Sequence, residues 1–119
     1  MALTAMDLVA SAKQNIQEVS IDEAKQQLDQ YLILDVREPE EYSQGHLPHA
    51  INIPRGVLEF KIGAHPAFQN ATDRAILVYC KTGGRSALAT ETLKKLGFEK
   101  AVSMAGGFDS WKDAGYDVE

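Results

Sequence analysis

Short apolar runs alternate with polar segments along the 119 residues of this chain. Residues 32–36, 50–53 and 76–79 are rich in Leu, Ile and Val and are bounded by turn-forming residues, a pattern that predicts short buried strands. Residues 17–19 and 101–103 are shorter runs and are interpreted as two further strands. The pattern therefore predicts about five strands.

Helices are expected between these strands. Apolar positions four residues apart predict an amphipathic helix over residues 4–16. Ser20 and Glu23 have the spacing of a capping box, so a second helix is expected from there to about residue 28. Strands that alternate with helices predict an α/β fold, a mostly parallel sheet of about five short strands with helices on both faces. Further helical segments are predicted from Pro39, over residues 56–62, from Ser86 to Leu96 before Gly97, and over residues 108–114.

Composition and charge narrow the function. The length and the 45% hydrophobic content suit one domain with one core. The 17 acidic and 12 basic residues give a net charge of −5, which argues against a nucleic-acid or membrane-surface partner. The first residues have neither the basic region nor the long apolar stretch of a targeting or membrane segment, so a cytoplasmic location is expected. The three histidines and the single cysteine show no zinc-ligand spacing, so no metal or other cofactor is expected.

Cys80 is the single cysteine and directly follows the predicted strand 76–79. A polar, glycine-rich segment comes next, Lys81-Thr82-Gly83-Gly84-Arg85-Ser86, and leads into a predicted helix. Backbone N–H groups at the start of a helix have no carbonyl partners within it and point into the preceding loop. These donors, the helix dipole and the cations Lys81 and Arg85 favour an ionised, nucleophilic sulfur. We therefore predict a cysteine nucleophile in an anion-binding loop at the carboxyl edge of the sheet, where α/β folds bind ligands.

Three stretches together resemble the single-domain rhodaneses, a sulfurtransferase family. They cover about residues 17–119, which the resemblance implies form a rhodanese-like domain, and residues 1–16 are expected to be an N-terminal helical extension. His49 and Phe108 depart from the family, which usually has glycine and commonly tryptophan at these positions. The first change is expected to affect a turn and the second only packing. The three stretches are Leu34 to Glu38 with Glu41-Tyr42 and Gly45 to Pro54; Cys80 to Ser86; and Gly106-Gly107-Phe108 with Trp111 and Gly115-Tyr116.

The resemblance implies a two-step sulfur transfer through Cys80. The thiolate attacks the outer sulfur of an anionic donor such as thiosulfate, sulfite leaves, and the cysteine carries a persulfide. Cyanide or a thiol acceptor, such as glutathione, thioredoxin or a sulfur-accepting protein, then removes that sulfur; with one cysteine, the acceptor must come from outside. The loop suits this chemistry because covalent catalysis divides the transfer and the N–H donors stabilise its anions. Lys81 and Arg85 are predicted to hold the sulfonate end of the donor.

Two alternatives stay open. Cysteine-dependent phosphatases also hold an anion in a cysteine-to-arginine loop at a helix start, but with one residue more than the four that separate Cys80 from Arg85. The shorter loop suits a sulfur atom better than a phosphoryl group, and no aspartate general acid is evident by motif. The other alternative is a non-catalytic binding or regulatory module of the same family. Such modules typically lose the cysteine or the cations, and this chain keeps both.

Several polar residues have a structural interpretation beside a functional one. Asp35 and Arg37 follow a predicted central strand and are candidates for lining the site, although a structural ion pair is favoured. His46 is interpreted as a hydrogen-bonded residue that fixes its turn, since an ionised sulfur needs no base. Arg55 either adds positive charge at the mouth of the loop or lies in solvent. Ser86 either hydrogen-bonds the sulfur or has an N-cap or first-turn role in the helix.

Overall fold

A single parallel sheet forms the centre of the molecule in the computed structural model, which describes residues 2–119. Its five strands lie in the order β1-β5-β4-β2-β3, and each neighbouring pair is parallel. The predicted α/β fold with about five short strands is therefore confirmed. The strands are β1 (Glu18–Val19), β2 (Leu32–Asp35), β3 (Ile51–Asn52), β4 (Ile76–Tyr79) and β5 (Ala101–Met104).

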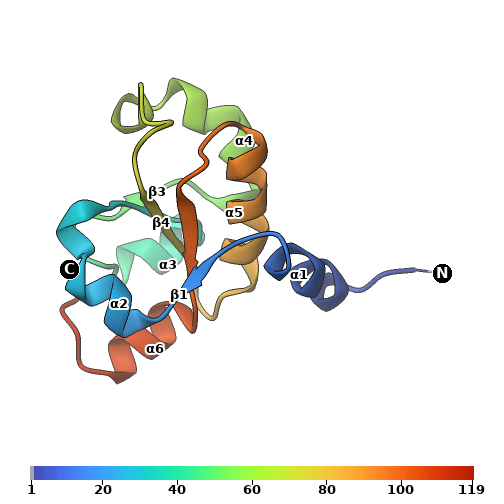
Figure 1. Ribbon diagram of the computed structural model, residues 1–119. Helices are drawn as coiled ribbons and strands as arrows, with labels where there is room; N and C mark the ends of the chain where they lie inside the picture. Colours follow the sequence, from blue (N-terminus) through green and yellow to red (C-terminus); the bar gives the residue numbers. More distant parts are fainter. Residues whose placement is uncertain (1) are drawn as a thin grey trace.

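Helices cover both faces of this sheet. Figure 1 shows α4 and α5 on one side and α2 and α6 on the other. The first helix, α1, packs on α5 through Val9, Ala12 and Ala87, while the division into an extension and a domain at residue 16 stays a prediction. The helices are α1 (Ala5–Lys13), α2 (Ile21–Gln26), α3 (Pro39–Ser43), α4 (Leu58–Lys61), α5 (Gly84–Lys95) and α6 (Gly107–Asp113). Short 3-10 turns are η1 (Leu28–Gln30), η2 (Arg55–Val57), η3 (Ile62–Ala64) and η4 (Pro66–Phe68).

Local signals account for the starts of α2 and α5. The predicted capping box is present, because Glu23 N donates to Ser20 Oγ at 3.1 Å and Ser20 N donates to the Glu23 carboxylate at 3.2 Å. Helix α5 starts at Gly84 rather than at the predicted Ser86. The reason is Gly83, whose φ of +119° lets the chain turn sharply from the strand into the helix.

Strand alternation decides which way the cysteine faces. Ile76, Val78 and Cys80 belong to the core cluster under α4 and α5, whereas Leu77 and Tyr79 belong to the cluster on the opposite face. Residues of β4 are buried on both faces, as expected of a central parallel strand. The fold therefore delivers the Cys80 side chain to the α5 side at the carboxyl end of the sheet.

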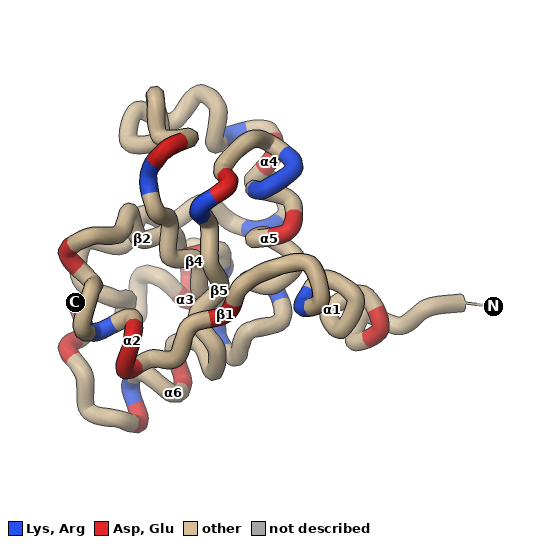
Figure 2. The backbone as a smooth tube through the Cα atoms, in the orientation of Figure 1, with Lys and Arg blue, Asp and Glu red and all other residues tan. Residues whose placement is uncertain are grey.

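Charged residues are distributed over most elements. Figure 2 shows Lys and Arg interspersed with Asp and Glu along the backbone.

Among residues 2–119, none of the helices combines the length and the apolar character needed to cross a bilayer. Within the same residues, no group of three or more His, Cys, Asp or Glu is placed to ligate a metal ion.

Candidate active site

Cys80 lies at the end of the central strand and is only 1% exposed. Its Sγ accepts hydrogen bonds from Gly83 N at 3.1 Å and from Ser86 N at 3.3 Å. Both donors come from the turn that opens α5, where backbone N–H groups lack helical partners. Two donors therefore converge on the atom where a thiolate charge would lie.

The Ser86 hydroxyl also belongs to the surroundings of the sulfur. Its Oγ lies 3.5 Å from Cys80 Sγ, donates to Gly83 O at 3.2 Å and lies 2.9 Å from Ser103 Oγ. Ser103 is fully buried on β5, next to β4. Ser86 thus contacts the sulfur and also lies in the first turn of α5, whereas the N-cap of this helix is Gly83. Sequence reasoning missed Ser103, whose only signal is a polar side chain in a predicted core strand.

The start of α6 holds the first part of the loop. Phe108 N donates to Cys80 O at 2.8 Å, and Asp109 N donates to Lys81 O at 3.0 Å. This approach requires glycine at position 107, because a Cβ there would lie 2.5 Å from Lys81 O and its φ is +61°. The third stretch of the resemblance, which begins at Gly106, therefore supports the cysteine loop directly.

Both loop cations have carboxylate partners. Lys81 Nζ lies 3.2 Å from Asp109 Oδ2, and both side chains are exposed, at 57% and 45%. Arg85 donates through Nη1 and Nη2 to the two oxygens of Glu41, at 2.7 and 3.1 Å. The sequence predicts that Lys81 and Arg85 hold the donor, but it does not predict that Asp109 and Glu41 pair with them. Glu41 on α3 is a further site residue that sequence reasoning missed.

The contact between Glu41 and Arg85 shifts the pKa of both groups. The Arg85 hydrogen bonds are the main cause that lowers the pKa of Glu41 to about 2. The same contact is the main cause that raises the pKa of Arg85, and attraction to Cys80 adds to it. Glu41 and Arg85 are therefore both charged at neutral pH.

Asp35 and Arg37 form a buried ion pair. Arg37 Nη2 lies 2.6 Å from Asp35 Oδ2 and donates to Gly45 O at 2.8 Å. The guanidinium stacks over the ring of Phe108, 4.4 Å from its centroid. Burial works against the Arg37 charge, but the hydrogen bonds and attraction of Asp35 outweigh it and raise the pKa of Arg37. The pair stabilises the turn at Gly45 and the packing of α6, and among the described residues neither member hydrogen-bonds to the cysteine loop.

Arg55 points toward α4 and α5. Its Nη1 donates to Glu59 at 3.1 Å and its Nη2 to Thr92 Oγ1 at 3.3 Å. Its Nε is buried without a partner among the described residues. These side-chain contacts lie outside residues 80–86, although the Arg55 backbone N donates to Val36 O at 3.0 Å, between Asp35 and Arg37.

The two histidines near β3 have structural contacts. His46 Nδ1 lies 2.9 Å from Leu47 O, and its ring stacks on Tyr42 at a centroid distance of 3.9 Å. His49 adopts a φ of +65°, a left-handed conformation that glycine adopts more readily. Its N–H donates to the Glu119 carboxylate at 3.2 Å. The turn therefore keeps a glycine-like conformation although the residue is histidine.

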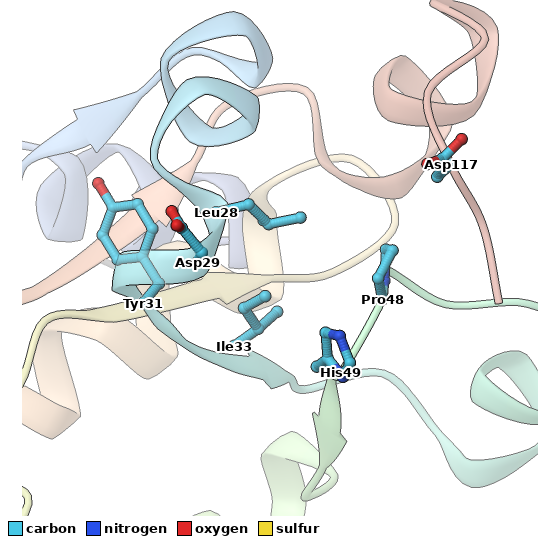
Figure 3. A pocket seen from close by; sticks show the side chains of 7 residues that line it. All are labelled: Leu28, Asp29, Tyr31, Ile33, Pro48, His49 and Asp117. Atoms are coloured by element: carbon cyan, nitrogen blue, oxygen red, sulfur yellow. The ribbon is translucent and has the colours of Figure 1, made fainter.

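A separate hollow of about 470 Å³ lies elsewhere in the molecule. Figure 3 shows it between η1, the start of β2, the turn before β3 and the C-terminal segment. Among the described residues, no member of the 80–86 loop lines it, so it is separate from the predicted anion-binding loop. Its lining residues are Leu28, Asp29, Tyr31, Ile33, Pro48, His49 and Asp117.

Comparisons with known proteins agree with this fold. The model of the rhodanese-like domain family matches residues 20–114. A Bacillus subtilis protein, provisionally named sulfur carrier protein YrkF, is 37% identical over 100 residues, which are 82% of this chain and 51% of that protein. The chain thus spans about half the length of this relative.

Two solved structures are similar over most of the chain. The first is RPA3614 from Rhodopseudomonas palustris, a protein of unknown function described as a possible tyrosine phosphatase. It is 30% identical, with a TM-score of 0.89, and the match covers 100% of this chain and 96% of that one. The second is the human single-domain sulfurtransferase TSTD1, 30% identical, with a TM-score of 0.71 and coverage of 81% and 95%.

Proposed function

The chain belongs to the rhodanese-like domain family, and from this we propose that it is a sulfurtransferase that carries sulfane sulfur as a persulfide on Cys80. One observation above all supports the proposal: the N–H groups of Gly83 and Ser86 both donate to the buried Sγ. Such donors stabilise the thiolate that attacks the donor, and they stabilise it again when the acceptor has removed the sulfur. The names of YrkF and TSTD1 point to the same chemistry in relatives.

The first half-reaction loads the cysteine. The thiolate of Cys80 attacks the outer sulfur of thiosulfate or of a persulfide donor, and a new S–S bond forms at Sγ. The S–S bond within the donor breaks, and its electron pair leaves with sulfite or with the donor thiolate. Atoms and charge balance without any oxidant or reductant, and without a cofactor.

The second half-reaction unloads it. A thiolate acceptor, such as glutathione, thioredoxin or a sulfur-accepting protein, or cyanide in the laboratory, attacks the outer persulfide sulfur. The electron pair of the broken bond returns to Cys80 Sγ as thiolate. Because the cycle needs a reduced thiol at both ends, we place the reaction in a reducing compartment, the cytoplasm.

A cysteine-dependent phosphatase is the second candidate, because RPA3614 is described as a possible tyrosine phosphatase. That chemistry uses the arginine fork to bind the phosphoryl oxygens. Here the fork of Arg85 holds Glu41, and four residues separate the cysteine from the arginine. The sulfurtransferase is therefore the proposal, and phosphatase activity is an outcome of its test.

Intact-mass spectrometry tests the proposal. The reduced protein is measured before and after addition of thiosulfate or of glutathione persulfide, and again after cyanide. The expected result is a gain of one sulfur atom that cyanide removes, and no gain in the Cys80→Ser variant, which has no other cysteine.

The outcomes separate the three candidates. A stable thiol that takes no sulfur from either donor would overturn the sulfurtransferase. Hydrolysis of para-nitrophenyl phosphate that is lost in Cys80→Ser would then support the phosphatase. Absence of both activities would support the non-catalytic binding or regulatory module.

A further inference from the structure

Glu41 is held in place between the cysteine loop and its own helix. Its Oε1 accepts from Arg85 Nη1 at 2.7 Å and from Glu38 N at 2.9 Å, and its Oε2 accepts from Arg85 Nη2 at 3.1 Å. The carboxylate thus engages both ends of the guanidinium fork, while the start of α3 fixes its position. An incoming anion must therefore compete with three hydrogen bonds to this carboxylate.

The other loop cation is held far less firmly. Lys81 makes a single 3.2 Å contact with Asp109, and both side chains are about half exposed. Exposed single-contact pairs of this kind contribute little to stability. Lys81 is therefore free to turn to a donor, whereas Arg85 has its planar donors occupied.

Resting on the proposed function, we infer that Glu41 sets the charge preference for the sulfur donor by occupying the Arg85 guanidinium. A dianion such as thiosulfate must displace this carboxylate or bind beside its negative charge. A thiol persulfide needs no sulfonate site, because its sulfur passes to Cys80 Sγ as the donor S–S bond breaks and the electron pair leaves on the donor thiolate. The preferred donors are therefore persulfides of small thiols or of proteins, and thiosulfate is a weak substrate.

Two alkylating reagents of similar size measure this preference without assuming sulfur transfer. Iodoacetate carries a negative charge and iodoacetamide carries none, and both modify Cys80, the single thiol. In Glu41→Gln the amide still accepts from Glu38 N but no longer neutralises Arg85. We expect the ratio of the iodoacetate rate to the iodoacetamide rate to rise about fivefold to tenfold, which is about 1 to 1.4 kcal/mol and matches the net contribution of a typical hydrogen bond.

Glu40→Gln is the matched control. Glu40 lies on the same short helix and its replacement removes the same charge, but it is exposed and its side chain has no contact with Arg85. We expect its ratio to stay within about twofold of the wild type, as for a screened surface charge. The double variant Glu41→Gln, Arg85→Ala should not show the raised ratio, because the rise depends on the guanidinium that Glu41→Gln leaves unpaired.

Steady-state assays with thiosulfate supply the second readout. Glu41→Gln is expected to lower KM about tenfold with kcat little changed, because the change acts on donor binding. An unchanged reagent ratio in Glu41→Gln, an equal rise in Glu40→Gln, or no labelling by either reagent would overturn the inference. A raised ratio without any sulfur transfer would support the role of Glu41 in selecting anions and reject the proposed function, so the two failures are distinguishable.

Discussion

Replacing Gly107 by alanine is the sharpest test of how the cysteine loop is supported. A Cβ at this position would lie 2.5 Å from Lys81 O and 2.7 Å from Cys80 O, whereas real Cβ contacts essentially never fall below 3.0 Å. The start of α6 must therefore move away from the loop. That movement weakens the bonds from Phe108 N and Asp109 N to the same two carbonyls.

The expected cost has two parts. A φ of +61° costs an alanine about 1 kcal/mol relative to glycine, and weakening two backbone hydrogen bonds costs about 1 kcal/mol each. We therefore expect the free energy of unfolding to fall by about 3 kcal/mol and Tm by roughly 12 °C for a domain of this size. Persulfide formation on Cys80, followed by intact mass, should slow as well, because the loop carbonyls lose their anchor.

Gly115 provides the matched control. It has a φ of +78°, yet a Cβ there would meet nothing within 4 Å. Gly115→Ala should therefore show only the backbone cost, about 1 kcal/mol and roughly 4 °C, with normal persulfide formation. Equal losses of stability in the two variants, measured by urea and thermal unfolding, would refute the claim that contact with the loop carbonyls requires Gly107.

Two further predictions concern the ion pairs. Asp35→Ala should lower the free energy of unfolding by about 3–5 kcal/mol, because it leaves the Arg37 guanidinium buried without its carboxylate; a loss below about 1 kcal/mol in urea denaturation would contradict this. Acid should lower the free energy of unfolding more in the wild type than in Glu41→Gln. Contact with Arg85 lowers the pKa of Glu41 from 4.5 to about 2. The stabilisation from this contact is therefore complete above pH 4.5 and is lost as pH falls toward 2. With these side chains 30% and 36% exposed, solvent screening limits the difference to about 1 kcal/mol, and identical pH dependence of unfolding in the two proteins would refute the assignment.

The fold was predictable where short-range signals decide it. Apolar runs locate all five strands, and the Ser20–Glu23 capping box locates the start of α2. The order β1-β5-β4-β2-β3 does not follow from such signals, because it depends on which faces pack together over long separations. The start of α5 at Gly84 depends on the φ of Gly83, which composition alone does not reveal.

The site was likewise predictable only where its residues are close together in the sequence. Residues 80–86 are contiguous, so their glycines and cations are enough to predict an anion-binding loop from the sequence alone. Glu41 lies 44 residues from Arg85 in sequence, and Ser103 lies 17 residues from Ser86. Neither contact has a local signal. The expectation that Lys81 and Arg85 hold the donor rested on their charges alone. Their partners, Glu41 and Asp109, are identified only by the three-dimensional structure.

Two kinds of group therefore act on the sulfur and on its donor. The N–H groups of Gly83 and Ser86 come from the turn between β4 and α5, so any side chains compatible with that turn would supply them. Charge at the mouth depends instead on side-chain pairs between distant elements, because a cation held by a carboxylate contributes little net field to an approaching anion. In the proposed sulfur transfer, Lys81 and Arg85 supply the charge beside Cys80, and the residues that pair with them decide which donor reaches it. In this chain the firmer of the two pairs is the one made by Glu41.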